Sequence, residues 1–411
     1  MPEVRRLLLR DDSDSMAGVV SENSAFGSRL SPNMKLGGIL CVSLTALIIA
    51  IALIVVLVTS GGNPGRKPAV GNKDVILLVG GQSTTSRCML DDIIAYDPDT
   101  GAHEPWSVVS KLPFPRMGHT TGVDKTTGQI VVVGGKTPQD LRASNKTTVF
   151  DPKQNKWMEG PPMTKKRFGS SGVVIGVDFY VCGGWDEWQE TIDLCEKYDL
   201  SQHTWTILPK PPKETTPNVS LSLPASTVAT DSQDLFLFGN TLEDRRQPEE
   251  KFLTLWVYRP QMTRWAEVKL ADQEMIRRGP VATYYNGTRS LLLCGGWSRL
   301  LRESYRDNCT SIPVKCSEVE KKTPKGTEIE FKCDESTPTP FADLKEERDW
   351  HDLVPWKGKV LAFSRPSSMP FFNLTIEEYD ANVDQWVLKH AKDLPIRRQH
   401  FSISVYGKEG K

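Results

Sequence analysis

The chain has 411 residues, with 51 basic and 51 acidic side chains and a pI near 7.0. This balance, without long blocks of like charge, argues against a nucleic-acid-binding protein and against a polybasic membrane-surface protein. The 31 glycines and 28 prolines are spread along the chain and favour many short strands joined by turns.

The first 60 residues divide into a polar segment and an apolar one. Residues 1–35 are rich in Ser, Asp and Arg, which predicts a disordered tail. Ile39–Val58 is an uncharged, predominantly apolar run of 20 residues, and a helix of that length crosses a hydrocarbon core of roughly 30 Å. We therefore predict a transmembrane helix at 36–60 and a linker at 61–74. A cleaved signal peptide is the alternative, but both its leader and its apolar core would be long, which favours an uncleaved signal-anchor.

The orientation of this span follows from features other than the flanking positive charges, which are nearly equal on the two sides. Seven of the eight cysteines follow the predicted span, and so do all the N-x-[ST] glycosylation sequons. These features favour a cytoplasmic tail and a luminal or extracellular C-terminal part, as in a single-pass type II protein of the plasma membrane or endomembrane system. The five sequons are at Asn145, Asn218, Asn286, Asn308 and Asn373.

A short motif lies in the predicted tail. Glu3, Leu7 and Leu8 stand in the sequence EVRRLL, which resembles an acidic dileucine sorting signal for endosomes or lysosomes. The alternative is a tail that only precedes the membrane anchor.

Two elements recur after the predicted span. The first is an apolar strand that ends in a glycine pair, as in VILLVGG at 75–81, IVVVGG at 130–135, FYVCGG at 179–184 and LLLCGG at 291–296. The second is an aromatic residue with a Trp downstream, seven residues on in all but the first copy. These aromatic pairs are Tyr96 with Trp106, Phe150 with Trp157, Tyr198 with Trp205, Tyr258 with Trp265, and Tyr379 with Trp386.

Each repeat is typical of a four-stranded antiparallel sheet that cannot bury both faces alone and must stack on its neighbours. The glycine pairs and the spaced aromatic residues resemble the kelch repeat over residues 75–406. The resemblance implies an all-β, six-bladed kelch-type β-propeller. It also implies that the strand at 401–406 pairs beside residues 75–79 and closes the ring. A propeller of five blades with an insertion is the alternative count.

Residues 297–345 interrupt the repeat in the fifth blade, where no aromatic–Trp pair is found. A segment this long is expected to be functional or held by disulfides. We predict that Cys182 pairs with Cys195 on adjacent strands, and that two of Cys309, Cys316 and Cys333 pair with each other. No CxxC motif or neighbouring His suggests zinc, so no metal and no cofactor is expected.

The loops that enter the blades and those that follow the glycine pairs are expected to share one face of the propeller. Basic side chains ahead of the inner strands and tryptophans after the glycine pairs could hold an acidic or sugar-like ligand there. The alternative is structural: the arginines bond backbone of a neighbouring blade and the tryptophans pack sideways. The candidates are Arg116, Arg167, Arg278, Arg398, Trp185, Trp188 and Trp297.

Repeated structural motifs without a catalytic constellation favour a membrane-anchored binding module for a protein or glycan. One alternative is a kelch-type carbohydrate-active enzyme, an epimerase or oxidase. Another is an adhesion or assembly protein that acts through blade edges or through the fifth-blade insertion.

Overall fold

The computed structural model describes residues 73–100, 105–211, 220–229, 234–242, 253–270, 281–295, 297–298, 304–305, 307–324, 326–348, 352–364, 374–389 and 398–407. The predicted tail, the predicted membrane span and most of the linker lie outside these residues, as do Glu3, Leu7 and Leu8. The candidates Arg278, Asn218 and Asn373 also lie outside them, and only the backbone of Trp297 is described. Within the described part, no helix has the length and apolar character needed to span a bilayer.

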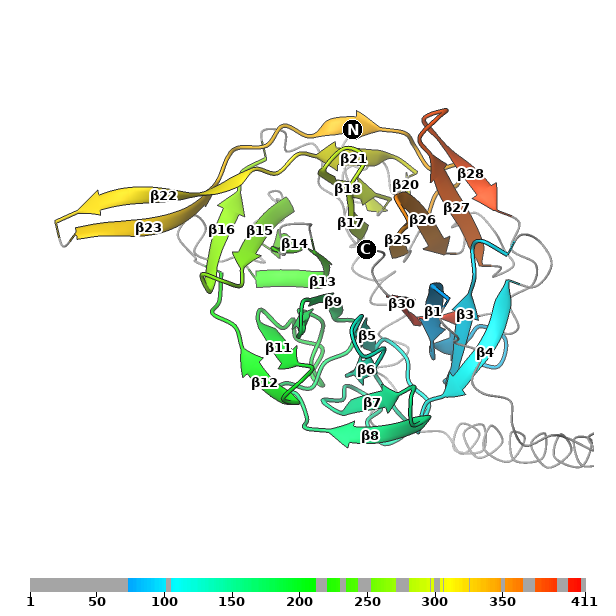
Figure 1. The fold of residues 1–411 in the computed structure, drawn as a ribbon. Coiled ribbons are helices and arrows are strands. Elements are labelled where there is room, and N and C mark those ends of the chain that lie inside the picture. The colour runs from blue at the N-terminus through cyan, green and yellow to red at the C-terminus, as the bar shows by residue number, and fades with distance from the viewer. Residues whose placement is uncertain are drawn as a thin grey trace, which may run out of the picture. The chain divides into compact units, whose positions relative to one another are not determined.

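Six four-stranded antiparallel sheets are arranged as blades around a central axis (Figure 1). In each blade the strands follow one another from the axis outward. Blade one is β30 (Ser402–Tyr406), β1 (Val75–Val79), β3 (Asp92–Tyr96) and β4 (Trp106–Lys111); blade two is β5 (Thr120–Val123), β6 (Ile130–Val133), β7 (Thr147–Asp151) and β8 (Lys156–Gly160); blade three is β9 (Ser171–Ile175), β10 (Asp178–Cys182), β11 (Cys195–Asp199) and β12 (Thr204–Ile207); blade four is β13 (Ser220–Ala229), β14 (Leu235–Leu242), β15 (Leu253–Arg259) and β16 (Arg264–Val268); blade five is β17 (Val281–Tyr285), β18 (Ser290–Cys294), β21 (Cys309–Ile312) and β24 (Thr339–Phe341); blade six is β25 (Asp352–Trp356), β26 (Lys359–Ser364), β27 (Thr375–Asp380) and β28 (Gln385–Lys389).

The apolar strands of the repeat are the second strands of their blades, counted from the axis. All residues of β1, β6 and β18 are buried, as expected for strands covered on both faces by neighbouring blades. The glycines that follow take positive φ values, for example 68° at Gly134 and 82° at Gly135. A Cβ at Gly134 would lie 2.8 Å from the carbonyl oxygen of Arg167, so only glycine allows the chain to leave the strand this close to the next blade.

The ring is closed by the C-terminal strand, as the sequence predicts. β30 pairs antiparallel with β1, with Val75 opposite Tyr406 and Val79 opposite Ser402. A short two-stranded sheet of β2 (Gln82–Ser83) and β29 (Arg398–Gln399) adds to this closure. Blade one therefore combines strands from both ends of the described propeller.

The aromatic pairs of the repeat lie directly opposite each other on the two outer strands of a blade. Tyr198 and Trp205 are register partners, with ring centroids 5.0 Å apart. The indole Nε1 of Trp205 donates to the carbonyl oxygen of Pro161 at 3.0 Å, directly after the outer strand of blade two. Trp265 and Trp386 make the corresponding bonds to Pro209 and Ala342. These three tryptophans thus join consecutive blades.

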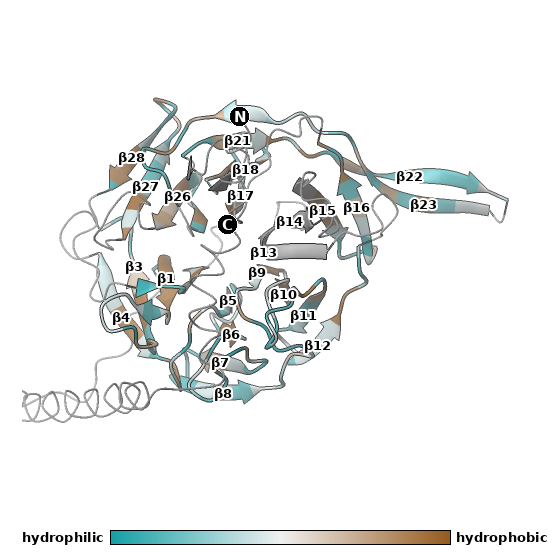
Figure 2. Ribbon diagram, turned by 180° about the vertical axis from the view of Figure 1, so that it is seen from behind, coloured by the Kyte–Doolittle hydropathy of each residue, from teal (hydrophilic) through white to brown (hydrophobic). Residues whose placement is uncertain are grey.

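Blade five is built without the aromatic pair. Ile312 stands opposite Leu291, in the register position that Tyr198 takes opposite Phe179 in blade three. The interruption at 297–345 contains the two outer strands of this blade as well as two hairpins, β19 (Trp297–Ser298) with β20 (Ser304–Tyr305), and β22 (Cys316–Thr323) with β23 (Gly326–Cys333). The longer hairpin projects outward from the ring (Figure 1) and carries mainly hydrophilic residues along β22 (Figure 2).

Among the described residues, three disulfides join directly opposed residues on paired strands. The expected bond between Cys182 and Cys195 is present in blade three. Cys294 and Cys309 form the same bond at the same register of blade five. In the insertion, the expected pair is Cys316 with Cys333, at the root of the β22–β23 hairpin.

Candidate functional site

The alternation of strand direction gives the propeller two different faces. Each innermost strand runs from the loop that enters its blade to a tight turn, and the second strand returns to the glycine pair. The entering loops and the loops after the glycine pairs therefore lie on one face, which we call the loop face. The turns that join first to second strands and third to outer strands lie on the other, which we call the turn face.

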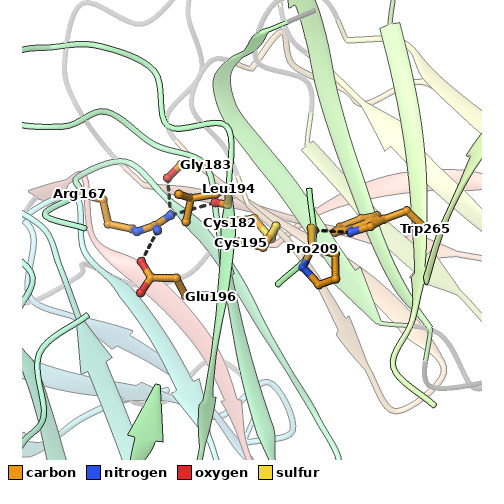
Figure 3. Close-up of a disulfide and its surroundings, with 8 residues drawn as sticks. All are labelled: Arg167, Cys182, Gly183, Leu194, Cys195, Glu196, Pro209 and Trp265. Atoms are coloured by element: carbon orange, nitrogen blue, oxygen red, sulfur yellow. Dashed lines mark hydrogen bonds and ion pairs between the residues drawn. A yellow bond between two sulfur atoms is a disulfide. The ribbon is translucent and has the colours of Figure 1, made fainter. Parts of the chain in front are cut away.

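The three candidate arginines that the structure describes lie inside the blades and not on the loop face. Arg116 and Arg167 have no exposed surface and Arg398 is 6% exposed. The guanidinium of Arg167 bonds Glu196 at 2.6 Å and donates to the carbonyl oxygens of Gly183 and Leu194 (Figure 3). Burial lowers the pKa of Arg167, and the Glu196 carboxylate opposes this shift. Each of these arginines therefore bonds groups of its own blade. The structural alternative had predicted bonds to the backbone of a neighbouring blade.

A further arginine of this series, Arg348, was not predicted. Arg348 is fully buried and bonds Glu377 through Nε at 3.0 Å and through Nη2 at 2.7 Å. It lies four residues before β25, as Arg167 lies four residues before β9. This spacing could have identified Arg348. The glycine found two residues after Arg116 and Arg167 could not, because Arg348 is not followed by one.

Arg116 differs from the others because no carboxylate meets its guanidinium. Thr148 in blade two occupies the register position of Glu196 in blade three. Nη1 of Arg116 donates to three backbone carbonyl oxygens at 3.2–3.4 Å. Its Nε and Nη2 have no hydrogen-bond partner within the described residues, and burial lowers its pKa to about 10.

His119 makes the stability of blade two depend on pH. Burial and then the nearby Arg116 charge lower the pKa of His119 to about 3 in the folded protein, against about 6.5 in an unfolded chain. As the pH falls, the unfolded state binds a proton at His119 before the folded state does. The contribution of His119 to the free energy of unfolding is therefore complete above pH 6.5 and is lost as the pH falls toward 3.

The free energy of unfolding should fall less steeply with decreasing pH in His119→Phe than in the wild type. We expect the difference to be up to about 1.4 kcal/mol for each pH unit below 6.5. Chemical unfolding of the wild type and the variant at pH 7.5, 5.5 and 4.5 measures the difference. A constant difference between the two proteins at all three pH values would contradict the prediction.

Aromatic and basic side chains, two of them exposed and three half-buried, come together on the loop face over blades two and three. Trp188 is 69% exposed, and the guanidinium carbon of Arg142 lies 5.5 Å from the centre of its ring. Trp185 stacks on Phe168, with centroids 5.4 Å apart and ring planes at 30°. Nζ of Lys136 lies 4.2 Å from the Phe168 ring centre, and burial lowers the pKa of Lys136. We call these five residues the aromatic–basic patch.

Local geometry fixes the loop that carries the two tryptophans. A carboxylate oxygen of Asp186 accepts hydrogen bonds from the backbone N–H of Trp188 at 2.8 Å and of Glu190 at 2.9 Å. Lys166 from the entering loop bonds Glu187 at 2.8 Å. A Cβ at Gly169 would lie 2.7 Å from the Trp185 ring, so glycine is needed for this ring to lie flat on the backbone. The patch is therefore largely ordered before any ligand binds.

The described sequons differ in accessibility. Asn286 is exposed in the turn between β17 and β18, on the turn face. Asn145 is half-buried, and its side-chain amide donates to the carbonyl oxygen of Met163 at 3.1 Å. Asn308 is also half-buried. Of these three, Asn286 is the best placed to carry a glycan.

Within the described residues, no group of three or more His, Cys, Asp or Glu side chains is arranged to hold a metal ion. Six blades closed by a C-terminal strand, with buried arginines and an aromatic–basic loop face, define a kelch-type β-propeller. Residues 68–298 match the family model described as the KLHDC2/KLHL20/DRC7 Kelch-repeats domain, and the chain belongs to this family.

Curated relatives share the repeat over part of their length. The chain is 29% identical to human Kelch-like protein 23 over 35% of this chain and 24% of that protein. It is 26% identical to mouse Kelch-like protein 38 over 61% of this chain and 40% of that protein. The chain thus matches less than half of the length of these relatives. Among solved structures it is similar in fold, at TM-score 0.51 and 17% identity, to a fungal alcohol oxidase of the AA5 family in complex with copper, over 80% of this chain and 64% of the oxidase.

Proposed function

We propose that the chain is a membrane-anchored kelch propeller that binds a partner protein through its loop face. The observation that carries the proposal is the aromatic–basic patch, in which Trp188 is 69% exposed beside Arg142. Trp and Arg are enriched among the residues that dominate binding energy at protein interfaces. The two cationic side chains of the patch, Lys136 and Arg142, favour an acidic segment of the partner.

The proposal includes a luminal or extracellular position for the propeller. It is supported by the apolar run at 39–58, by the sequons after it, and by three disulfides in the described propeller, since disulfides persist in oxidising compartments. Glycosidase treatment of the full-length protein from cells should increase its gel mobility. In sealed membranes, the propeller should resist protease until detergent is added. Digestion of the propeller from the cytosolic side without detergent would contradict this topology.

Trp188→Ala is expected to weaken partner binding by about 30-fold or more, as loss of an interfacial anchor worth about 2 kcal/mol does. The wild-type protein should bind acidic peptides on a peptide array, and the variant should bind the same peptides much more weakly. Val177→Ala is the matched control, because Val177 is 56% exposed in a turn on the opposite face. Equal binding by both variants would contradict a role for the patch. Binding only to a parallel glycan array would replace the protein partner with a carbohydrate.

A further inference from the structure

A cavity of about 280 Å³ lies on the turn face between blades four and five. Phe236 and Leu291, both buried, provide an apolar lining, and Tyr284 adds a half-buried ring. Arg289 comes from the turn between β17 and β18, and Lys315 from the segment between β21 and β22. The cavity is therefore on the opposite face from the aromatic–basic patch.

The charged side chains of the lining differ in whether they form salt bridges. Arg259 bonds Asp234 through two hydrogen bonds of 3.0 and 2.9 Å, and it also bonds Glu318 at 3.3 Å. That arginine is thus neutralised and held in place. Arg289 and Lys315 are exposed, and within the described residues neither forms a salt bridge. The cavity is thus lined by both apolar and polar side chains, and Arg289 and Lys315 are its two positive side chains that form no salt bridge within the described residues.

The projecting hairpin holds one wall of the cavity. The Cys316–Cys333 disulfide closes its root, and Cys316 lines the cavity. Phe331 of β23 is 5% exposed and packs in the hydrophobic cluster of blades four and five, with the Arg259 guanidinium 4.3 Å from its ring centre. The wall is thereby fixed by a covalent bond, an ion pair and buried apolar contact, which reduces the ordering cost of binding.

We propose that this cavity is a second binding site, for an oxyanion group on an apolar stem. Carboxylate, sulfate and phosphate share the acceptor oxygens that Arg and Lys bind. The cavity volume of about 280 Å³ is slightly smaller than the roughly 300 Å³ of the smallest pockets for drug-sized ligands. It therefore suits a single anchoring group. The stem would contact Phe236 and Leu291, and the anion would meet Arg289 and Lys315.

Ligand-observed NMR with the full-length protein in detergent tests this site, in an Asn286→Gln background that removes any glycan from the adjacent turn. The probes are 3-phenylpropionate, phenyl sulfate and phenyl phosphate, which distinguish the three possible anions, with benzyl alcohol as the neutral comparison. At least one anionic probe should bind more tightly than benzyl alcohol. Arg289→Ser with Lys315→Ser should then weaken its binding at least ten-fold.

Lys321→Ser with Lys332→Ser is the charge-matched control, because both lysines are exposed farther along the hairpin and do not line the cavity. This pair should leave probe binding unchanged. Equal losses in the two double variants would overturn the proposal in favour of diffuse charge attraction. Absence of probe binding to the Asn286→Gln protein, or equal binding of benzyl alcohol, would also overturn it. Since Trp188→Ala leaves this face intact, its effect on partner binding is a separate result.

Discussion

A stop codon in place of Arg398 is expected to abolish cooperative folding of the propeller. The truncation removes β29 and β30, and β30 provides the innermost strand of blade one. β1 would keep β3 on one side but lose its partner on the inner edge along its whole length, and solvent would reach this edge, where Ile76, Leu77 and Leu78 are fully buried in the intact protein. Such an unpaired apolar edge is unstable and prone to aggregation. Calorimetry and near-ultraviolet circular dichroism should show no cooperative transition.

The control is a stop directly after residue 407, which leaves β30 whole. This protein should unfold with the wild-type midpoint. A truncation at 398 that keeps a sharp transition near that midpoint would show that the other blades hold the ring without the closing strand.

Arg167→Met is expected to destabilise the propeller by about 3–5 kcal/mol, because it leaves a buried carboxylate without its partner. The side chain of Glu196 has no exposed surface and bonds Nη2 of Arg167 at 2.6 Å. Arg116→Met leaves no buried carboxylate unpaired; it removes hydrogen bonds to backbone carbonyls and the contact of the guanidinium with the Phe114 ring, and should cost less, about 1–3 kcal/mol. Urea unfolding of the two variants in parallel measures the difference.

The double variant Arg167→Met with Glu196→Gln tests the stated cause. A neutral Gln keeps an acceptor for the backbone N–H groups of Thr164 and Lys165, which bond Glu196 in the wild type. Stability should therefore recover in part relative to Arg167→Met alone. Equal destabilisation by Arg116→Met and Arg167→Met, without recovery in the double variant, would contradict the importance of the buried ion pair.

The repeat could be recognised from the sequence because its marker residues recur at short, regular spacings. A glycine pair after an apolar strand and an aromatic residue seven positions before a Trp are local signals, and each meets its partner on an adjacent strand. Blade five gave only the first of these signals, the glycine pair after β18, since Ile312 replaces the aromatic residue and a hairpin separates β21 from β24. Its outer strands therefore could not be recognised from the repeat.

The candidate site was predicted only in part. Trp185 and Trp188 follow a glycine pair, and the structure places both on the loop face. The arginines also follow the repeat, but their spacing cannot distinguish an exposed guanidinium from one that bonds a carboxylate inside the blade. Lys136 and Phe168 were missed because they come from two other loops, and only the tertiary fold brings them to Trp185.

Hydrogen–deuterium exchange on the propeller with a bound acidic peptide tests the central claim most directly. Binding through the aromatic–basic patch predicts slower exchange in residues 134–146 and 183–194, the loops that carry Lys136, Arg142, Trp185 and Trp188. Protection confined to the turn face or to the β22–β23 hairpin, with these loops unchanged, would contradict it.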